Sequence, residues 1–221
     1  MYRCCIFDLD GTLLNTIHAL TFTTNRVMER FGLPLVTEEQ MKHFVGDGYK
    51  KQVERALLSA GDKGMEHYEE ALLVYMKEFE KYCLYQVEPY DGIQELLDFL
   101  KKQGIKIAVF SNKPHLRAVE NIEGTFGKGF FDLVAGEKPG IKKKPDPAGV
   151  FLIMEKLQVR PEECLYFGDT NTDMKTGKAA GLDTVGVLWG FRGREELEKF
   201  HPKYLISHPL QIIEILSGDK G

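Results

Sequence analysis

The chain has 221 residues, of which 43% are hydrophobic and 28% are charged, and these proportions are typical of a folded globular protein, not of a disordered or fibrous one. Lys and Arg number 29 and Asp and Glu number 33, giving a net charge of −4, which argues against nucleic acid or an anionic membrane as the main partner. No apolar run approaches the roughly 20 residues that span a bilayer, and the apolar stretch before Asp8 is too short for a signal peptide.

The first predicted element is a buried strand at residues 4–7, a short apolar run that ends in acidic residues. Residues 16–85 differ from the rest, because they carry helical patterns and no convincing strand. We interpret residues 16–85 as a helical cap domain inserted into a core made of residues 1–15 and 86–221. The alternative is that these helices form one layer of the same domain.

After the helical stretch, the chain alternates between helices and strands. Apolar residues at helical spacing predict helices at 93–100, 150–157 and 172–180. Short apolar runs predict strands at 105–110, 133–135, 165–167 and 184–187. Strands alternating with helices indicate a parallel sheet covered on both faces. The expected fold class is therefore α/β, with a doubly wound core and the helical cap as an insertion.

Two acids, Asp8 and Asp10, follow the first predicted strand and precede Gly11. In an open parallel sheet, ligands bind outside the carboxyl ends of the strands. Two carboxylates this close need a positive partner, and a hard divalent cation such as Mg²⁺ is the obvious one. The alternative is an ordinary surface turn rich in Asp and Gly.

Further polar residues follow the later strands. Ser111 and Asn112 come directly after the run 105–110, where they suit phosphate oxygens but also the capping of a helix. Lys144 is the one of three adjacent lysines that we expect to face the site, because Pro145 restricts its backbone to an extended conformation. The other two lysines are expected to lie in a solvated loop.

Asp169 follows another predicted strand, and Asp173 lies four residues later, where one helical turn would bring it back beside Asp169. A capped helix with acids in its first turn is the alternative interpretation of this segment. All these groups follow separate strands and would converge on one crevice of a doubly wound sheet. Acids for a metal, a hydroxyl and a cation for an anion, and a carboxylate nucleophile together indicate phosphoryl transfer.

Four short motifs resemble those of the haloacid dehalogenase superfamily of hydrolases, and the resemblance spans nearly the whole chain. The motifs are Asp8-Leu9-Asp10-Gly11-Thr12, Ser111-Asn112, Lys144-Pro145, and Gly168-Asp169 with Asp173. Within the superfamily the chain is most similar to phosphoglycolate phosphatase-like proteins, which share runs such as Phe44-Val45-Gly46-Asp47-Gly48. The resemblance implies a Rossmann-like core with the cap as a lid.

The resemblance also implies roles for the acids. Asp8 would be the nucleophile that forms an aspartyl-phosphate, and Asp10 the general acid for the leaving group and then the base for water. Mg²⁺ would be held by the Asp8 carboxylate, the backbone carbonyl of Asp10 and Asp169, with Asp173 supporting it through water.

The remaining motif residues are implied to bind substrate. Ser111 and Lys144 would hold the phosphoryl group, with Asn112 assisting. The cap loop formed by Gly46, Asp47 and Gly48 would contribute to substrate specificity, with a plain connecting turn as the alternative. The roles of Trp189 and Arg192 stay open.

The expected function is a Mg²⁺-dependent phosphatase for a small phosphorylated metabolite, with phosphoglycolate as the best single substrate. Other phosphatases of sugar phosphates or nucleotides, a pyrophosphatase and a phosphomutase are alternatives within the superfamily. A phospho-accepting regulatory protein or a non-catalytic binding protein is the alternative of another class. Because the four cysteines show no metal-ligand spacing, we expect reduced thiols in a cytoplasmic protein, as a monomer or a small homo-oligomer.

Overall fold

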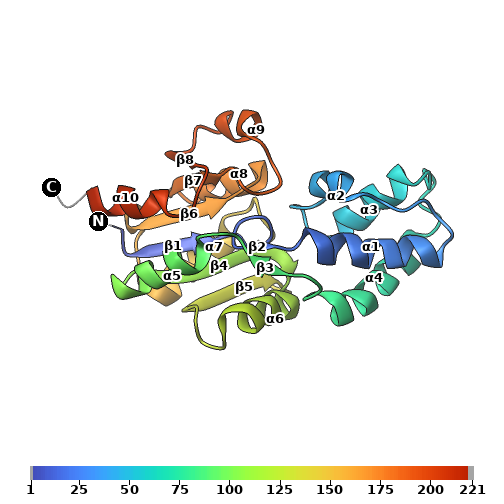
Figure 1. Cartoon of the computed structure of the whole chain (residues 1–221), viewed down its shortest axis with the longest axis horizontal. Helices are drawn as coiled ribbons and strands as arrows, with labels where there is room; N and C mark the ends of the chain where they lie inside the picture. The colour runs from blue at the N-terminus through green and yellow to red at the C-terminus, as the bar shows by residue number, and fades with distance from the viewer. Residues whose placement is uncertain (1, 219–221) are drawn as a thin grey trace.

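The computed structural model describes residues 2–218 and consists of an α/β core with a bundle of helices beside it (Figure 1). Within the described residues, the core holds a six-stranded parallel sheet in the order β5–β4–β1–β6–β7–β8. The strands are β1 Cys4–Phe7, β4 Lys106–Pro114, β5 Leu133–Glu137, β6 Cys164–Gly168, β7 Asp183–Val187 and β8 Tyr204–Ile206. The predicted Rossmann-like α/β fold is confirmed.

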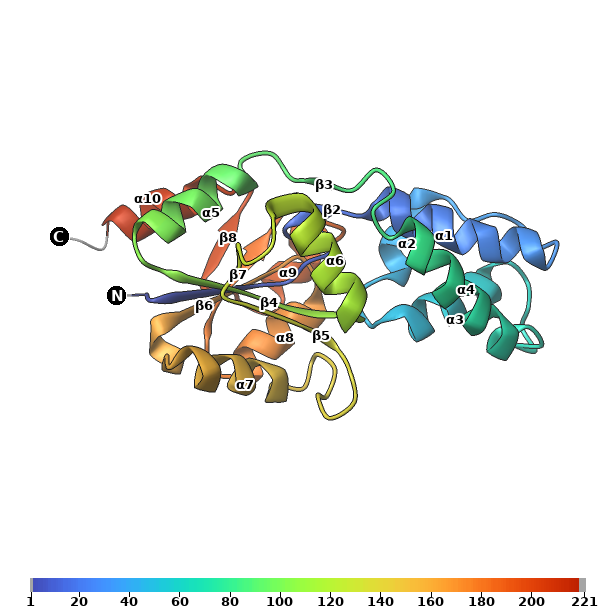
Figure 2. The same ribbon diagram turned by 90° about the horizontal axis from the view of Figure 1, so that it is seen from below.

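Successive side chains of the central strand enter two different hydrophobic layers, as the two-residue period of a strand requires. Cys5 and Phe7 of β1 pack in the layer that also holds the apolar faces of α5, α6 and α10. Cys4 and Ile6 pack in the opposite layer, with α7. Figure 2 shows α5 and α10 on one side of the sheet and α7 and α8 on the other. These helices span Ile93–Lys102 (α5), His115–Phe126 (α6), Ala148–Leu157 (α7), Asn171–Ala179 (α8) and Gln211–Gly218 (α10).

The bundle consists of α1 Ile17–Arg30, α2 Glu38–Phe44, α3 Tyr49–Ser59 and α4 Tyr68–Tyr82. It has a hydrophobic cluster of its own, which includes Val27, Met41, Val53 and Tyr75. The chain enters the bundle after β2 (Leu14–Asn15) and leaves it before β3 (Glu88–Pro89), and these two short strands pair antiparallel. This pairing holds the entry and the exit side by side. The division into a cap at 16–85 and a core stays our interpretation of this arrangement.

The elements near the site match the prediction in position, but some were not predicted. Strand β4 runs on through Ser111 and Asn112, four residues beyond the expected end at residue 110. Helix α6, strand β8 and helix α9 (Arg194–Glu198) were also missed. Strand β8 has three residues and helix α9 has five, which are too few to show a hydrophobic period.

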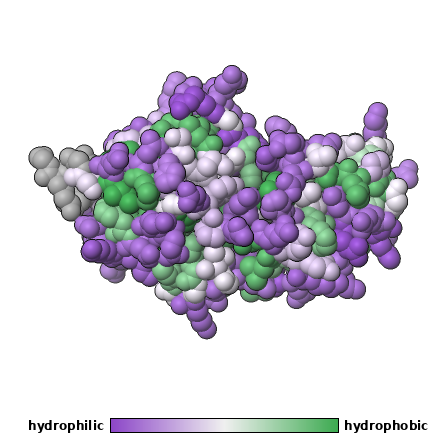
Figure 3. Space-filling model, viewed as in Figure 1, coloured by the Kyte–Doolittle hydropathy of each residue, from purple (hydrophilic) through white to green (hydrophobic). Residues whose placement is uncertain are grey.

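The face of the molecule seen in Figure 3 is mostly hydrophilic, and its hydrophobic residues form separate patches. Among the described residues, no helix is both long enough and apolar enough to cross a membrane.

Candidate active site

The candidate site lies where the carboxyl ends of β4, β1 and β6 meet, since these three strands are neighbours in the sheet. Asp8 directly follows β1, and Asp169 directly follows β6. Ser111 and Asn112 belong to the last part of β4. Here the strand order changes direction, which is where open α/β sheets form their ligand crevices. The topology therefore brings the separate motifs to one edge of the sheet.

Three buried carboxylates face one another at this edge. One oxygen from each of Asp8, Asp169 and Asp173 lies within 4.8 Å of the others. Burial, and then the carboxylate of Asp173, raises the pKa of Asp8 to about 7. Burial raises the pKa of Asp169 well above its usual value, with Asp173 and Asp8 adding to the effect. Like charges held this close in a buried place favour a bound cation.

Lys144 provides one positive charge to this cluster. Its ammonium nitrogen Nζ lies 2.7 Å from Oδ1 of Asp8 and 2.7 Å from Oδ1 of Asp173, and only 2% of its side chain is exposed. Burial alone would lower the pKa of Lys144, but the two carboxylates raise it well above its usual value. When all four groups are ionised, the three acids and Lys144 leave two negative charges uncompensated. A divalent cation with a preference for oxygen ligands fits that balance.

The oxygen atoms of the acids differ in how they are engaged. Oδ1 of Asp8 is buried, and its polar contact is the Lys144 ammonium at 2.7 Å. Both oxygens of Asp169 accept hydrogen bonds, from Thr12 Oγ1 at 3.2 Å and from the backbone N–H of Phe191 at 2.8 Å. Asp169 is therefore held in place by two neutral donors, whereas Asp8 faces the charged ammonium of Lys144.

Asp173 both caps helix α8 and contacts Lys144. It is therefore a residue of the site and a helix cap at the same time. Its Oδ2 accepts hydrogen bonds from Thr170 Oγ1 at 2.6 Å and from the Thr170 N–H at 3.1 Å, in a capping box at the start of α8. Its Oδ1 accepts a hydrogen bond from Lys144 at 2.7 Å.

The turn after Asp10 depends on the absence of a side chain at Gly11. Its φ of +82° is in the left-handed region, and a Cβ there would lie 2.3 Å from Oδ2 of Asp169. Trp189 supports the same turn, since its Nε1 donates a hydrogen bond to the Thr12 carbonyl at 3.0 Å. This answers the open question about Trp189: it holds the loop that carries the acids.

The side chain of Asn112 joins strand β4 to the backbone of Lys144 and to the backbone of Gly46. Its Oδ1 accepts a hydrogen bond from the Lys144 N–H at 2.8 Å, and its Nδ2 donates to the Lys144 carbonyl at 3.1 Å. The same Nδ2 donates to the carbonyl of Gly46 in the bundle at 3.1 Å. Ser111, the other predicted phosphate-binding residue on β4, lines the pocket.

Lys113 is a buried cation of the site that the sequence reasoning missed. Its Nζ lies 2.5 Å from Oδ1 of Asp10, and only 2% of its side chain is exposed. The side chain of Asp10 therefore faces Lys113 and does not belong to the acidic triad, which leaves its backbone carbonyl as the group that could contact a metal. The signal in the sequence was the position of Lys113 directly after Ser111 and Asn112.

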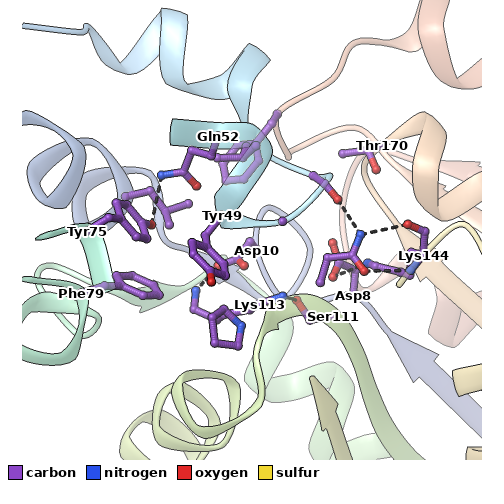
Figure 4. A pocket seen from close by; sticks show the side chains of 17 residues that line it. Asp8, Asp10, Tyr49, Gln52, Tyr75, Phe79, Ser111, Lys113, Lys144 and Thr170 are labelled. Atoms are coloured by element: carbon purple, nitrogen blue, oxygen red, sulfur yellow. Dashed lines mark hydrogen bonds and ion pairs between the residues drawn. The ribbon is translucent and has the colours of Figure 1, made fainter. Parts of the chain in front are cut away.

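The pocket between the core and the bundle is divided into two sides (Figure 4). Asp8, Lys144 and Thr170 lie on one side, and Asp10 and Lys113 face Tyr49, Tyr75 and Phe79 on the other. Gln52, also from the bundle, donates hydrogen bonds to Tyr75 Oη at 3.1 Å and Thr24 Oγ1 at 3.0 Å. The empty space is about 470 Å³, including the open mouth, so it accepts a small molecule.

The loop Gly46-Asp47-Gly48 meets the core at the mouth of this pocket. Gly46 and Gly48 line the pocket. Asp47 forms an ion pair with Arg55 and accepts a hydrogen bond from Thr172 Oγ1 at 3.0 Å. Although burial alone would raise the pKa of Asp47, Arg55 and Thr172 lower it. Asp47 thus joins the bundle to the core.

Arg192 makes a second connection between the two parts. Its guanidinium donates hydrogen bonds to the backbone carbonyls of Lys42 and Val45, at the end of α2. It also lies near Glu196, with 3.5 Å between Nε and Oε2. The role left open for Arg192 is therefore contact with the helical bundle.

A model of the haloacid dehalogenase-like hydrolase family matches residues 5–187, which is most of the chain. The chain belongs to this family. Similar proteins include phosphoglycolate phosphatases from Colwellia psychrerythraea, 30% identical with 90% of each chain covered, and from Aquifex aeolicus, 30% identical with 98% of this chain and 97% of the relative covered.

Solved structures of the haloacid dehalogenase-like family share the fold. One from Lactobacillus delbrueckii, provisionally assigned as a phosphoglycolate phosphatase, has a TM-score of 0.90 at 31% identity and covers 97% of this chain and 98% of its own. One from Thermotoga maritima, provisionally assigned as a β-phosphoglucomutase, has a TM-score of 0.76 at 25% identity, with 99% of each chain covered. The predicted family and enzyme class, a phosphoric monoester hydrolase, are confirmed.

Proposed function

We propose that this protein is a Mg²⁺-dependent phosphatase of small phosphomonoesters and that 2-phosphoglycolate is its first candidate substrate. The observation that carries the proposal is the pair of carboxylates Asp8 and Asp10, each facing its own lysine at one pocket. The phosphoglycolate phosphatases among the similar proteins support the choice of substrate.

In this proposal Asp8 is the nucleophile. An oxygen of its carboxylate attacks the phosphorus, the bond between phosphorus and the ester oxygen breaks, and an aspartyl-phosphate forms. The position of Asp8 at the carboxyl end of β1, where it lines the pocket beside Lys144, supports this role. Water then attacks the phosphorus, and the bond between phosphorus and Asp8 breaks to release phosphate and the original carboxylate.

Asp10 is proposed as the general acid and base. It lies on the side of the pocket away from Lys144, where the leaving group would be. Asp10 gives a proton to the ester oxygen as it leaves and takes one from the water in the second step. Lys113 keeps the carboxylate of Asp10 oriented between these steps.

Ser111 and Lys144 are proposed to bind the phosphoryl oxygens, with Asn112 supporting them by fixing the backbone of Lys144. Phosphoryl transfer depends mainly on positioning and on stabilising charge, and these groups provide both.

The magnesium ion would be held by the carboxylates of Asp8 and Asp169 and by the carbonyl of Asp10, with Asp173 behind them. When bound, it supplies the positive charge that lets a dianionic phosphate approach the carboxylate of Asp8. The buried acidic triad supports such a site, since its negative charge exceeds what Lys144 neutralises.

The deciding experiment is a panel of small phosphomonoesters assayed with Mg²⁺ and with chelator. We expect turnover with Mg²⁺, highest for 2-phosphoglycolate, and its loss with chelator. A long-lived phosphorylated form without turnover would favour a phospho-accepting regulatory protein instead, and neither turnover nor phosphorylation would favour a binding protein.

We also propose that the protein works in a reducing compartment such as the cytoplasm. All four cysteines are free and buried, and Cys4 and Cys164 stay unlinked although they are direct neighbours on β1 and β6.

A further inference from the structure

Lys113 is a buried cation on the side of the pocket where the leaving group would lie. Its Nζ touches one carboxylate oxygen, Oδ1 of Asp10, at 2.5 Å, and lies 5.2 Å from the centre of the Phe79 ring. Only 2% of its side chain is exposed. A lysine loses hydration when it is buried, so a further anionic partner stabilises its ammonium group.

The charges around the pocket leave Lys113 as the cation available to such a partner. The charged residues that line the described pocket are Asp8, Asp10, Lys113 and Lys144. Lys144 contacts two carboxylates at 2.7 Å and sits on the phosphoryl side. Lys113 contacts one carboxylate, and its surroundings on the bundle side are the rings of Tyr49, Tyr75 and Phe79.

We propose, resting on the proposed phosphatase function, that Lys113 determines substrate specificity by binding an oxyanion carried by the leaving group. Because Asp10 must reach the ester oxygen to protonate it, and Lys113 touches Asp10, the ammonium reaches only an anion close to that oxygen. A carboxylate on the carbon next to the ester oxygen meets this condition. The substrate class is therefore a short phosphorylated hydroxy acid.

The aromatic rings beside Lys113 strengthen its preference for an anionic leaving group. Tyr75 and Phe79 are fully buried within the bundle and stack on one another, with 5.3 Å between their ring centres. Because these rings are buried, the ammonium interaction acts in a poorly hydrated place, where it is stronger than in water.

The test compares two esters of similar size on the intact protein. One is 2-phosphoglycolate, whose leaving group carries a carboxylate, and the other is 2-hydroxyethyl phosphate, whose leaving group is neutral. We expect wild-type kcat/KM to favour 2-phosphoglycolate by about 10- to 100-fold, the range of a charge-assisted hydrogen bond. Pyrophosphate is assayed alongside, because its leaving group is also an oxyanion, and a preference for pyrophosphate over 2-phosphoglycolate would overturn the carboxylate assignment.

The variant Lys113→Met keeps the length of the side chain and removes its charge. We expect the rates with both esters to fall, because Asp10 loses its partner. The ratio of kcat/KM for 2-phosphoglycolate to kcat/KM for 2-hydroxyethyl phosphate should also fall, to about threefold or less. Lys142→Met is the matched control, because Lys142 is 76% exposed and pairs only with Asp146 at 3.2 Å among the described residues. An unchanged preference in Lys113→Met overturns the proposal and leaves Lys113 with the positioning of Asp10.

A second measurement needs no variant. Glycolate and ethylene glycol are compared as inhibitors of p-nitrophenyl phosphate hydrolysis by the wild-type enzyme. We expect glycolate to inhibit at concentrations at least about tenfold lower; equal inhibition overturns the role of Lys113. If the protein hydrolyses none of the phosphate compounds, the phosphatase function is overturned, and the inference with it. If it hydrolyses the two matched esters equally well, the inference alone is overturned.

Discussion

The carboxylates of Asp8 and Asp10, two residues apart in the chain, are held by two different lysines on opposite sides of one pocket. Asp8 lies 2.7 Å from Lys144, and Asp10 lies 2.5 Å from Lys113. The strand ends at Phe7, so the alternation of a strand no longer applies, and the two side chains meet different lysines. One short motif can therefore supply two acids with different tasks.

Replacing the proposed nucleophile tests the centre of the mechanism. Asp8→Asn keeps the shape of the side chain but removes the attacking oxyanion, so we expect kcat to fall at least about 1000-fold. Steady-state assays and circular dichroism would show lost turnover with an intact fold. Asp91→Asn is the control, since the Asp91 side chain is 99% exposed. Near-normal turnover in Asp8→Asn would contradict the assignment.

The general acid can be recognised by its dependence on the leaving group. Asp10→Asn should lower kcat for an alkyl phosphate by about 100- to 10,000-fold. The loss should be much smaller for p-nitrophenyl phosphate, whose leaving group departs without a proton. Assays of both esters with the variant measure this difference, and equal losses would mean that Asp10 acts through structure alone.

The stability of the cation-free protein should depend on pH through Asp8. Its pKa is about 7 in the folded protein and 3.8 in an unfolded chain, so the folded state binds the proton more tightly. Between these two values the unfolded chain has lost the proton and the folded protein keeps it, so the free energy of unfolding falls as the pH rises, by up to about 4 kcal/mol.

Thermal unfolding in chelator tests this dependence. Asp8→Asn should raise Tm over the wild type by more at about pH 8 than at about pH 5. Added Mg²⁺ should raise the Tm of the wild type at the higher pH, and should do so less for the variant. A gain that does not change with pH would show that Asp8 is not the group responsible.

Arg192 connects the core to the helical bundle, and its loss should weaken the closed arrangement of the pocket. Arg192→Met removes the hydrogen bonds to the carbonyls of Lys42 and Val45, and we expect kcat/KM to fall about tenfold. The control is Arg194→Met, because Arg194 is exposed and pairs with Glu198 at 2.9 Å. If both variants keep wild-type kcat/KM, the contact has no part in substrate binding.

Much of the fold was predictable because it rests on local patterns. The runs at β1, β4, β6 and β7 are short, apolar and bounded by turn residues, and buried parallel strands require that pattern. Helix α4, Tyr68–Tyr82, lies within the stretch 16–85 that was expected to be helical from its apolar pattern. Strand β8 was not, since three residues are too few to show a period.

The partners of the charged side chains were less predictable. Lys144 was singled out from Lys142 and Lys143 because Pro145 follows it, whereas Lys113 was missed. Only in the folded chain does Lys113 meet Asp10 and Lys144 meet Asp173, while Lys142 pairs with Asp146 at the surface.

The sequence by itself determined the α/β class, the order of the motifs and the kinds of group that could meet at the sheet edge, because hydrophobic period and strand ends are local properties. The tertiary structure decided which lysine faces which acid, that Asp173 both caps α8 and orients Lys144, and that Arg192 reaches α2. Those outcomes depend on segments far apart in the chain. A charge is buried only where such a segment supplies its partner.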